Sequence, residues 1–168
     1  TNTSPINLSD GSTGETHSFI KDPDTRPDLN ATGILGALDI TGSSFTNFRN
    51  AVFTSVCTLT NCKFIGLDEI TQSGATLNGC TFQDATTEDG AALVISDDPA
   101  EISNCEFTFS QGHAIEITAT GTYTFSDNVF TNYGADDTTS AAIYNNSGGA
   151  VTLNVSGTAP TVRNGAGA

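Results

Sequence analysis

Pairs of acidic residues are the first groups in this sequence that could do chemistry. Two carboxyl groups held about 5 to 9.5 Å apart can hydrolyse a glycosidic bond, one as the acid and the other as the nucleophile or base. The candidate pairs are Asp68 with Glu69, Asp97 with Asp98, and Glu101 with Glu106. Asp97 and Asp98 precede a proline, a context in which Asp hydrogen-bonds to the local backbone of a turn. We therefore interpret the pairs as solvated acids, with glycan hydrolysis as the alternative.

The remaining reactive residue types form no recognisable catalytic or metal-binding pattern. The two histidines, His17 and His113, give little support to a Ser-His-Asp arrangement and are interpreted as surface residues. The sequence contains neither a Cys-x-x-Cys pair nor an Asp-x-Asp-x-Asp-Gly calcium loop. We expect no catalytic residues, no cofactor and no bound metal ion.

The charge balance excludes some classes of partner. The formal net charge is -14, from five Lys and Arg against 19 Asp and Glu. Nucleic acids and anionic membrane surfaces need cationic residues, so we expect neither as a partner. An acidic, lysine-poor surface stays soluble at high salt, which suggests a saline or marine setting. An ordinary acidic surface protein is the alternative.

A short repeat organises most of the chain. Each copy starts with an apolar residue, has Gly, Asn or Asp two places later, then a small residue, and usually ends in Phe. The copies are residues 40–45, 59–64, 77–82, 102–107, 125–130 and a degraded 153–158. The Gly, Asn or Asp position predicts a left-handed bend, because these residues enter that conformation at the lowest cost. It is occupied by Gly42, Asn61, Gly79, Asn104 and Asp127.

Aligning the copies predicts two columns of buried side chains. The repeat spacing, from 18 residues (Phe64 to Phe82) to 25 (Phe82 to Phe107), is typical of a solenoid whose coils complete each other's core. The expected aromatic column is Phe45, Phe64, Phe82, Phe107 and Phe130, and the expected thiol column is Cys62, Cys80 and Cys105. We interpret the thiols as reduced and buried, with oxidation between adjacent coils as the alternative.

A second segment follows each Phe and supports the same alignment. Its copies, residues 49–54, 90–95, 112–117 and 140–145, predict the inward columns Ala51/Ala92/Ala114/Ala142 and Val52/Leu93/Ile115/Ile143. The outward residues Phe53, Val94 and Tyr144, interrupted by Glu116, would form an apolar lateral stripe, the candidate interface of a homotrimer. Residues 66–72 fit the columns poorly, and their register is left open.

The repeat and its stacked columns resemble the right-handed parallel β-helices of the pectin-lyase-like kind over about residues 34–158. We therefore predict an all-β protein, a right-handed parallel β-helix of about six short coils. The resemblance implies a fold and not an activity. Polysaccharide lyases that look like this use calcium-binding carboxylates and a basic residue. Only Arg49 and Lys63 are basic within the coils, and neither adjoins an acidic cluster.

The two ends of the chain differ from the coils in amino-acid composition. Residues 1–33 contain three prolines and few apolar residues, which predicts an extended N-terminal arm or a cap over the first coil. Residues 159–168 predict a C-terminal tail. Methionine is absent, even at position 1. We expect a complete, cytosolically made chain, with a fragment of a longer protein as the alternative.

At the level of the fold, the chain also resembles the trimeric β-helices of tailed-virus spikes and capsid-decorating proteins. The expected function is a non-enzymatic capsid decoration (cement) protein on the virion surface, assembled in the host cytoplasm. Its expected partners are two further copies of itself and the major capsid protein or another shell protein, contacted through the arm or the tail. The alternatives are a tailspike-like polysaccharide-binding or depolymerising domain and a cell-surface adhesin repeat.

Overall fold

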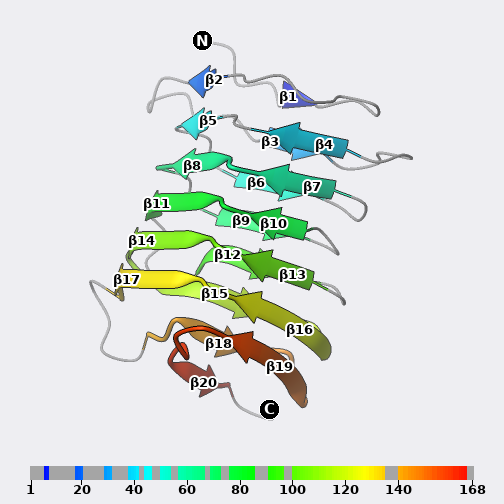
Figure 1. The fold of residues 1–168 in the computed structure, drawn as a ribbon, viewed down its shortest axis with the longest axis vertical. Helices are drawn as coiled ribbons and strands as arrows, with labels where there is room; N and C mark the ends of the chain where they lie inside the picture. Colours follow the sequence, from blue (N-terminus) through cyan, green and yellow to red (C-terminus); the bar gives the residue numbers. More distant parts are fainter. Residues whose placement is uncertain are drawn as a thin grey trace.

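The structure is a computed structural model of the 168-residue chain. It describes the backbone of residues 6–7, 18–20, 29–31, 38–41, 44–46, 50–53, 57–66, 69–72, 76–85, 91–96, 100–134 and 140–165. Side chains are described within residues 58–66, 76–84, 91–96, 100–108, 111–134 and 140–165. The described strands stack into a column with the first strand at one end and the last strand at the other (Figure 1).

The strands form three parallel sheets, here called A, B and C. Sheet A contains, in spatial order, β1 (Ile6–Asn7), β3 (Leu29–Ala31), β6 (Asn50–Phe53), β9 (Glu69–Gln72), β12 (Ala91–Ile95), β15 (His113–Ile117), β18 (Ile143–Asn145) and β20 (Val162–Asn164). Sheet B contains β4 (Leu38–Thr41), β7 (Cys57–Thr60), β10 (Thr76–Asn78), β13 (Ala100–Ser103), β16 (Gly121–Ser126) and β19 (Val151–Ser156). Sheet C contains β2 (Ser18–Ile20), β5 (Ser44–Thr46), β8 (Lys63–Ile65), β11 (Thr81–Ala85), β14 (Glu106–Ser110) and β17 (Val129–Tyr133).

The chain passes through sheets B, C and A in turn and then begins the next coil. The described strands make five complete coils, from β4–β5–β6 to β16–β17–β18, with incomplete coils at both ends. Each strand therefore pairs with the strand one coil away and not with its neighbour in the sequence. This arrangement confirms the predicted all-β parallel β-helix.

Bends with positive φ separate sheet B from sheet C. Asn61, Gly79, Asn104 and Asp127 have φ values of 52°, 66°, 53° and 54°. The ladder of backbone hydrogen bonds continues through the bend, since the N–H of each of these residues donates to the carbonyl of the next coil at 2.8 to 3.1 Å. The structure thus places a bend at every predicted position that it describes; Gly42 lies outside the described residues.

The sixth copy of the repeat starts later than the sequence suggested. Val155, and not Leu153, pairs with Phe125, and Leu153 pairs with Tyr123. The bend of this copy is therefore Gly157, whose φ is 83°. The predicted start at Leu153 is wrong by two residues, because the strand period of two also keeps Leu153 on the inward face.

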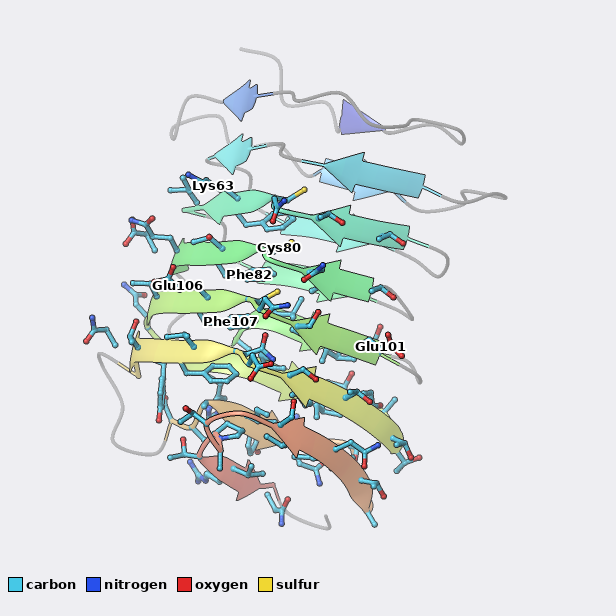
Figure 2. All side chains as sticks on the ribbon, viewed as in Figure 1. Lys63, Cys80, Phe82, Glu101, Glu106 and Phe107 are labelled. Atoms are coloured by element: carbon cyan, nitrogen blue, oxygen red, sulfur yellow. The ribbon has the colours of Figure 1, made fainter. Side chains whose placement is uncertain are left out.

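The aromatic column lies inside sheet C. The rings of Phe64 and Phe82 have centroids 5.1 Å apart, those of Phe82 and Phe107 are 4.6 Å apart, and those of Phe107 and Phe130 are 5.1 Å apart, with interplanar angles of 14° or less. Figure 2 shows Phe82 and Phe107 one above the other. The register continues the column upward, where Phe45 pairs with Phe64.

The predicted alignment of sheet A needs a correction of one residue. Ile70 pairs with both Ala51 and Leu93, so Ala51 occupies the column of Leu93, and Val52 does not. Phe53 accordingly aligns with Ile95, through Gln72, and not with Val94. The cause is the coil at residues 66–72, which supplies Ile70 to the column but was left out of the alignment.

The boundaries predicted at both ends also change. Within residues 1–33, predicted to be an arm or a cap, β2 pairs with β5 and β3 pairs with β6, so at these strands the chain extends the coil upward. Within the predicted tail, residues 159–168, β20 pairs with β18 as the last strand of sheet A. The strands at the two ends were not predicted, because strands of two or three residues carry no readable periodicity.

Replacement of Phe107 by alanine tests the aromatic column. Phe107→Ala leaves a gap between Phe82 and Phe130 inside a buried stack, so the free energy of unfolding should fall by about 3–5 kcal/mol. Urea denaturation measures it, with Thr152→Ala on an exposed position as the control. A loss in Phe107→Ala no larger than that of the control would contradict the stacked core.

Candidate functional site

The acidic residues predicted as a possible catalytic pair do not share a site. Glu101 lies on β13 in sheet B and Glu106 on β14 in sheet C, on either side of the bend at Asn104, and both are exposed. Figure 2 shows their side chains well apart on the surface. Glu106 instead accepts a hydrogen bond from Thr108 at 3.0 Å. Lys63 lies two coils from Glu106 in the same column.

The other predicted acids fall largely outside the described part of the chain. Asp68, Asp97 and Asp98 are not described, and only the backbone of Glu69 is. Among the side chains that the structure describes, no three His, Cys, Asp or Glu gather closely enough to hold a metal ion. The described residues also include no helix that is long and apolar enough to span a membrane.

The cysteine column is a hydrogen-bonding element of the bend. Cys80 Sγ lies 3.3 Å from the carbonyl oxygen of Leu59 in the preceding coil, and the Cys80 N–H donates to Cys105 Sγ at 3.4 Å. Asn128 holds the next position of the column: its Oδ1 accepts from the Cys105 N–H at 2.9 Å, and its Nδ2 donates to the carbonyl of Ile102 at 2.8 Å. Each inner side chain thus contacts backbone groups that the bend removes from the ladder.

The thiols are reduced and buried, and their pKa values diverge. Cys62, Cys80 and Cys105 are free cysteines with at most 1% of their surface exposed. The side-chain hydrogen bond with Cys105, with burial adding to it, raises the pKa of Cys80 to about 12. The same hydrogen bond lowers the pKa of Cys105. The three thiols pack inside the coil, and Cys80 stays protonated at neutral pH because its pKa is raised.

A second series of bends, which the sequence interpretation missed, follows the aromatic column. Gly66, Asp84 and Asn132 have φ values of 66°, 54° and 53°. Each stands two residues after a Phe of the column, so the signal was a recurring Phe-x-Gly/Asp/Asn. Asp84 and Asn132 bend β11 and β17 next to their last residues, Ala85 and Tyr133, which still pair with Ser110 of β14.

The predicted trimer stripe is not an exposed apolar row. Val94 is only 8% exposed, and in its register stand Thr71 and Glu116. Phe53 belongs to a different register position, as described above. Tyr144 does lie on the outer side but is half-buried. The candidate interface of Phe53, Val94 and Tyr144 is therefore corrected to Tyr144 with polar neighbours.

Tyr144 belongs to a small stack of aromatic and cationic groups. Its ring lies 4.3 Å from the ring of His113, at an interplanar angle of 22°, and Arg163 sits 5.9 Å from the centroid of its ring. His113 was predicted to be a surface residue but is only 8% exposed, and its Nδ1 accepts a hydrogen bond from the Ala141 N–H at 3.0 Å. This stack ties the last strands of sheet A together.

The C-terminal end of the coil carries the exposed apolar residues. Val129, Val155 and Val162 are 52%, 40% and 48% exposed, and they are the exposed large hydrophobic residues among the described side chains. They lie on β17, β19 and β20, the last described strands of sheets C, B and A. We call the surface formed by these three strands the terminal face; it is the lower end of the column in Figure 1.

The terminal face contains a hollow. Residues 157–161 connect β19 directly to β20, without the strand of sheet C that each complete coil has at this point. The hollow measures about 200 Å³ and is lined by Asn128, Val129, Phe130, Tyr133, Ala142 and residues 158–161. Thr161 fixes its far wall, since its Oγ1 lies 2.7 Å from Tyr133 Oη and accepts from the Ala142 N–H at 3.0 Å. We call this space the terminal hollow.

The bends, the inward columns and the three parallel sheets are those of a known family. The sequence model for the right-handed β-helix region matches residues 66–164, more than half of the chain. The chain belongs to the right-handed β-helix family. Neither the curated proteins nor the solved structures compared with it gave a match. Membership in the right-handed β-helix family gives the handedness of the coil, and it leaves the role of the protein to be argued from its surface.

Reagent access tests the burial of the thiols. In a Cys57→Ser variant, which removes the fourth cysteine, Cys62, Cys80 and Cys105 should not react with a disulfide reagent at pH 8 in the native state. At that pH a thiol with a pKa of about 12 is ionised in about one molecule in 10,000. Three thiols should react after denaturation. Rapid native labelling of Cys80 would contradict the buried column.

Replacement of Asn128 tests the inner hydrogen bonds of the bend. Asn128→Leu keeps the branched shape of the side chain but leaves the Cys105 N–H and the Ile102 carbonyl without their partner, so the free energy of unfolding should fall by about 2–4 kcal/mol. Asn154→Leu, at an exposed position of β19, is the matched control. Equal effects on the denaturation midpoint in the two variants would show that the Asn128 contacts contribute nothing.

Proposed function

We propose that this β-helix is a non-enzymatic structural protein of a virion, a capsid-decorating (cement) protein at the particle surface. The observation that carries the proposal is the terminal face, which presents one exposed valine on the last strand of each sheet. Unpaired strand edges together with exposed apolar residues are features of protein contact surfaces. A protein partner fits this surface better than a small substrate does.

The interior of the molecule supports a structural role. The described inward positions are filled by the aromatic column, the thiol column and aliphatic residues, which form one continuous core. Such a core makes a stiff element, since neighbouring coils hold each other over their whole length. A stiff element with a contact surface at one end is suited to bridging or covering other proteins.

The proposed partners are shell proteins and further copies of the chain. A net charge of -14 keeps the exposed sides of the molecule in solvent and favours a partner with basic residues around its contact site. The proposed assembly remains a homotrimer. The corrected positions of Phe53 and Val94 remove the lateral apolar stripe as its contact surface, and the terminal face is left for the shell protein.

Attachment would stabilise the shell by mass action. A protein that binds only the assembled shell stabilises it by about 2.7 kcal/mol at a free concentration 100 times its dissociation constant. No turnover is needed for this effect, because binding to the assembled shell supplies it.

Analysis of purified particles tests the proposed function. Quantitative mass spectrometry of gradient-purified virions should find the chain in many copies per particle, and particles that lack it should release their genome at a lower temperature. Light scattering of the isolated protein should give the mass of three chains. Absence of the chain from purified particles would overturn the virion role.

A further inference from the structure

The aromatic column stops at the terminal face. Phe64, Phe82, Phe107 and Phe130 stack at centroid distances of 4.6 to 5.1 Å, and Phe130 is the last described member. Phe64, Phe82 and Phe107 are at most 2% exposed, whereas Phe130 is only partly buried. One face of the Phe130 ring therefore contacts Phe107, and the ring also lines the terminal hollow.

The terminal hollow matches one aromatic ring in size and polarity. Its volume is about 200 Å³, and apolar cavities of roughly 150 Å³ are large enough for benzene. Val129, Phe130, Tyr133 and Ala142 supply apolar walls, and residues 158–161 close the far side. A planar ring that enters here would continue the column at its existing spacing, an arrangement that aromatic pairs favour.

The strand beside the hollow has a free edge. In a parallel ladder, successive residues direct their N–H and C=O groups to opposite sides. The Val129 N–H donates to the Cys105 carbonyl, on the side of β14, so the N–H and C=O of Phe130 face the other side. Among the described strands, sheet C ends there at β17. An extended segment can add to such an edge through its backbone.

We propose that the terminal hollow binds an aromatic side chain presented by an extended segment of a partner protein. The ring takes the next place below Phe130, and the backbone of the segment pairs with the free edge of β17. The net charge of -14 favours basic residues on either side of that aromatic residue. This inference rests on the proposed function and names the contact by which the terminal face would hold its partner.

A tryptophan peptide is a direct probe, because this chain contains no tryptophan. The pentapeptide Lys-Thr-Trp-Thr-Lys, blocked at both ends, is titrated with the protein while indole fluorescence is excited selectively. Binding in the hollow should shift the emission to shorter wavelength in a saturable way. Free 3-methylindole, tested in parallel, should bind about tenfold more weakly, since it lacks the backbone that pairs with β17.

Two variants fill the hollow from opposite walls. Ala142→Leu and Ala159→Leu should each weaken peptide binding by about tenfold or more, because the added side chain occupies the place of the ring. Ala150→Leu, at an exposed position away from the hollow, should bind the peptide as the parent does. Circular dichroism and thermal unfolding establish that each variant is folded. Ala159 lies on the connection at residues 157–161, so Ala159→Leu carries the test if Ala142→Leu does not fold.

Three results would overturn the inference: no saturable shift with the parent protein, unchanged binding in a folded hollow-filling variant, or binding of 3-methylindole as tight as that of the peptide. The last result would assign the hollow to small aromatic ligands. The virion analysis can succeed when the peptide titration fails, and the reverse also holds, so failure of the contact and failure of the proposed function are distinguishable.

Discussion

The structure depends on bending a parallel ladder without leaving buried backbone groups unpaired. A coil of this size turns sharply between sheets B and C, and an unpaired buried N–H or carbonyl costs about 1–3 kcal/mol. Two features meet this constraint. Residues with positive φ, such as Asn104, make the turn while their own N–H stays in the ladder. Inner side chains of the next coil, such as Asn128, then reach the groups that the turn removed.

This constraint explains why the most reactive side chains have structural roles. A residue at the inner bend must be small and must offer a donor and an acceptor, and both cysteine and asparagine meet these requirements. Cys80 and Cys105 are therefore held between coils, where burial and their mutual hydrogen bond set their pKa values. The pattern ends only at the last coil, which has no further strand of sheet C to complete it. There the apolar interior meets solvent, and there we place the contact surface.

The sequence predicted the bends between sheets B and C and the aromatic column because each needs a rare residue type at a fixed spacing. A left-handed bend selects Gly, Asn or Asp, and the stacked interior selects Phe, so five copies were readable without a structure. The second bend series uses the same residue types, but it has Phe109 in place of one of them, which hides the repeat. The second bend series can be recognised only after the strands of sheet C have been paired.

The register of sheet A and the terminal hollow could not be predicted in the same way. Alanine, valine and isoleucine all fit an inward strand position, so an alignment shifted by one residue at Ala51 still places apolar residues in the column. The same shift moves Phe53 to a different register position. The hollow arises because residues 157–161 bypass sheet C. This bypass could not be predicted, because it is recognisable only after β19 and β20 are assigned to sheets B and A.

Amide hydrogen exchange at the bend tests the central claim most directly. The N–H groups of Cys80 and Cys105 donate to side chains of the following coil, whereas those of Gly79 and Asn104 donate to backbone carbonyls. If the inner side chains complete the ladder, all four amides should exchange equally slowly, and Cys105→Ala should speed exchange at Cys80 without affecting Asn104. Fast exchange at Cys80 and Cys105 in the unmodified protein would contradict the account.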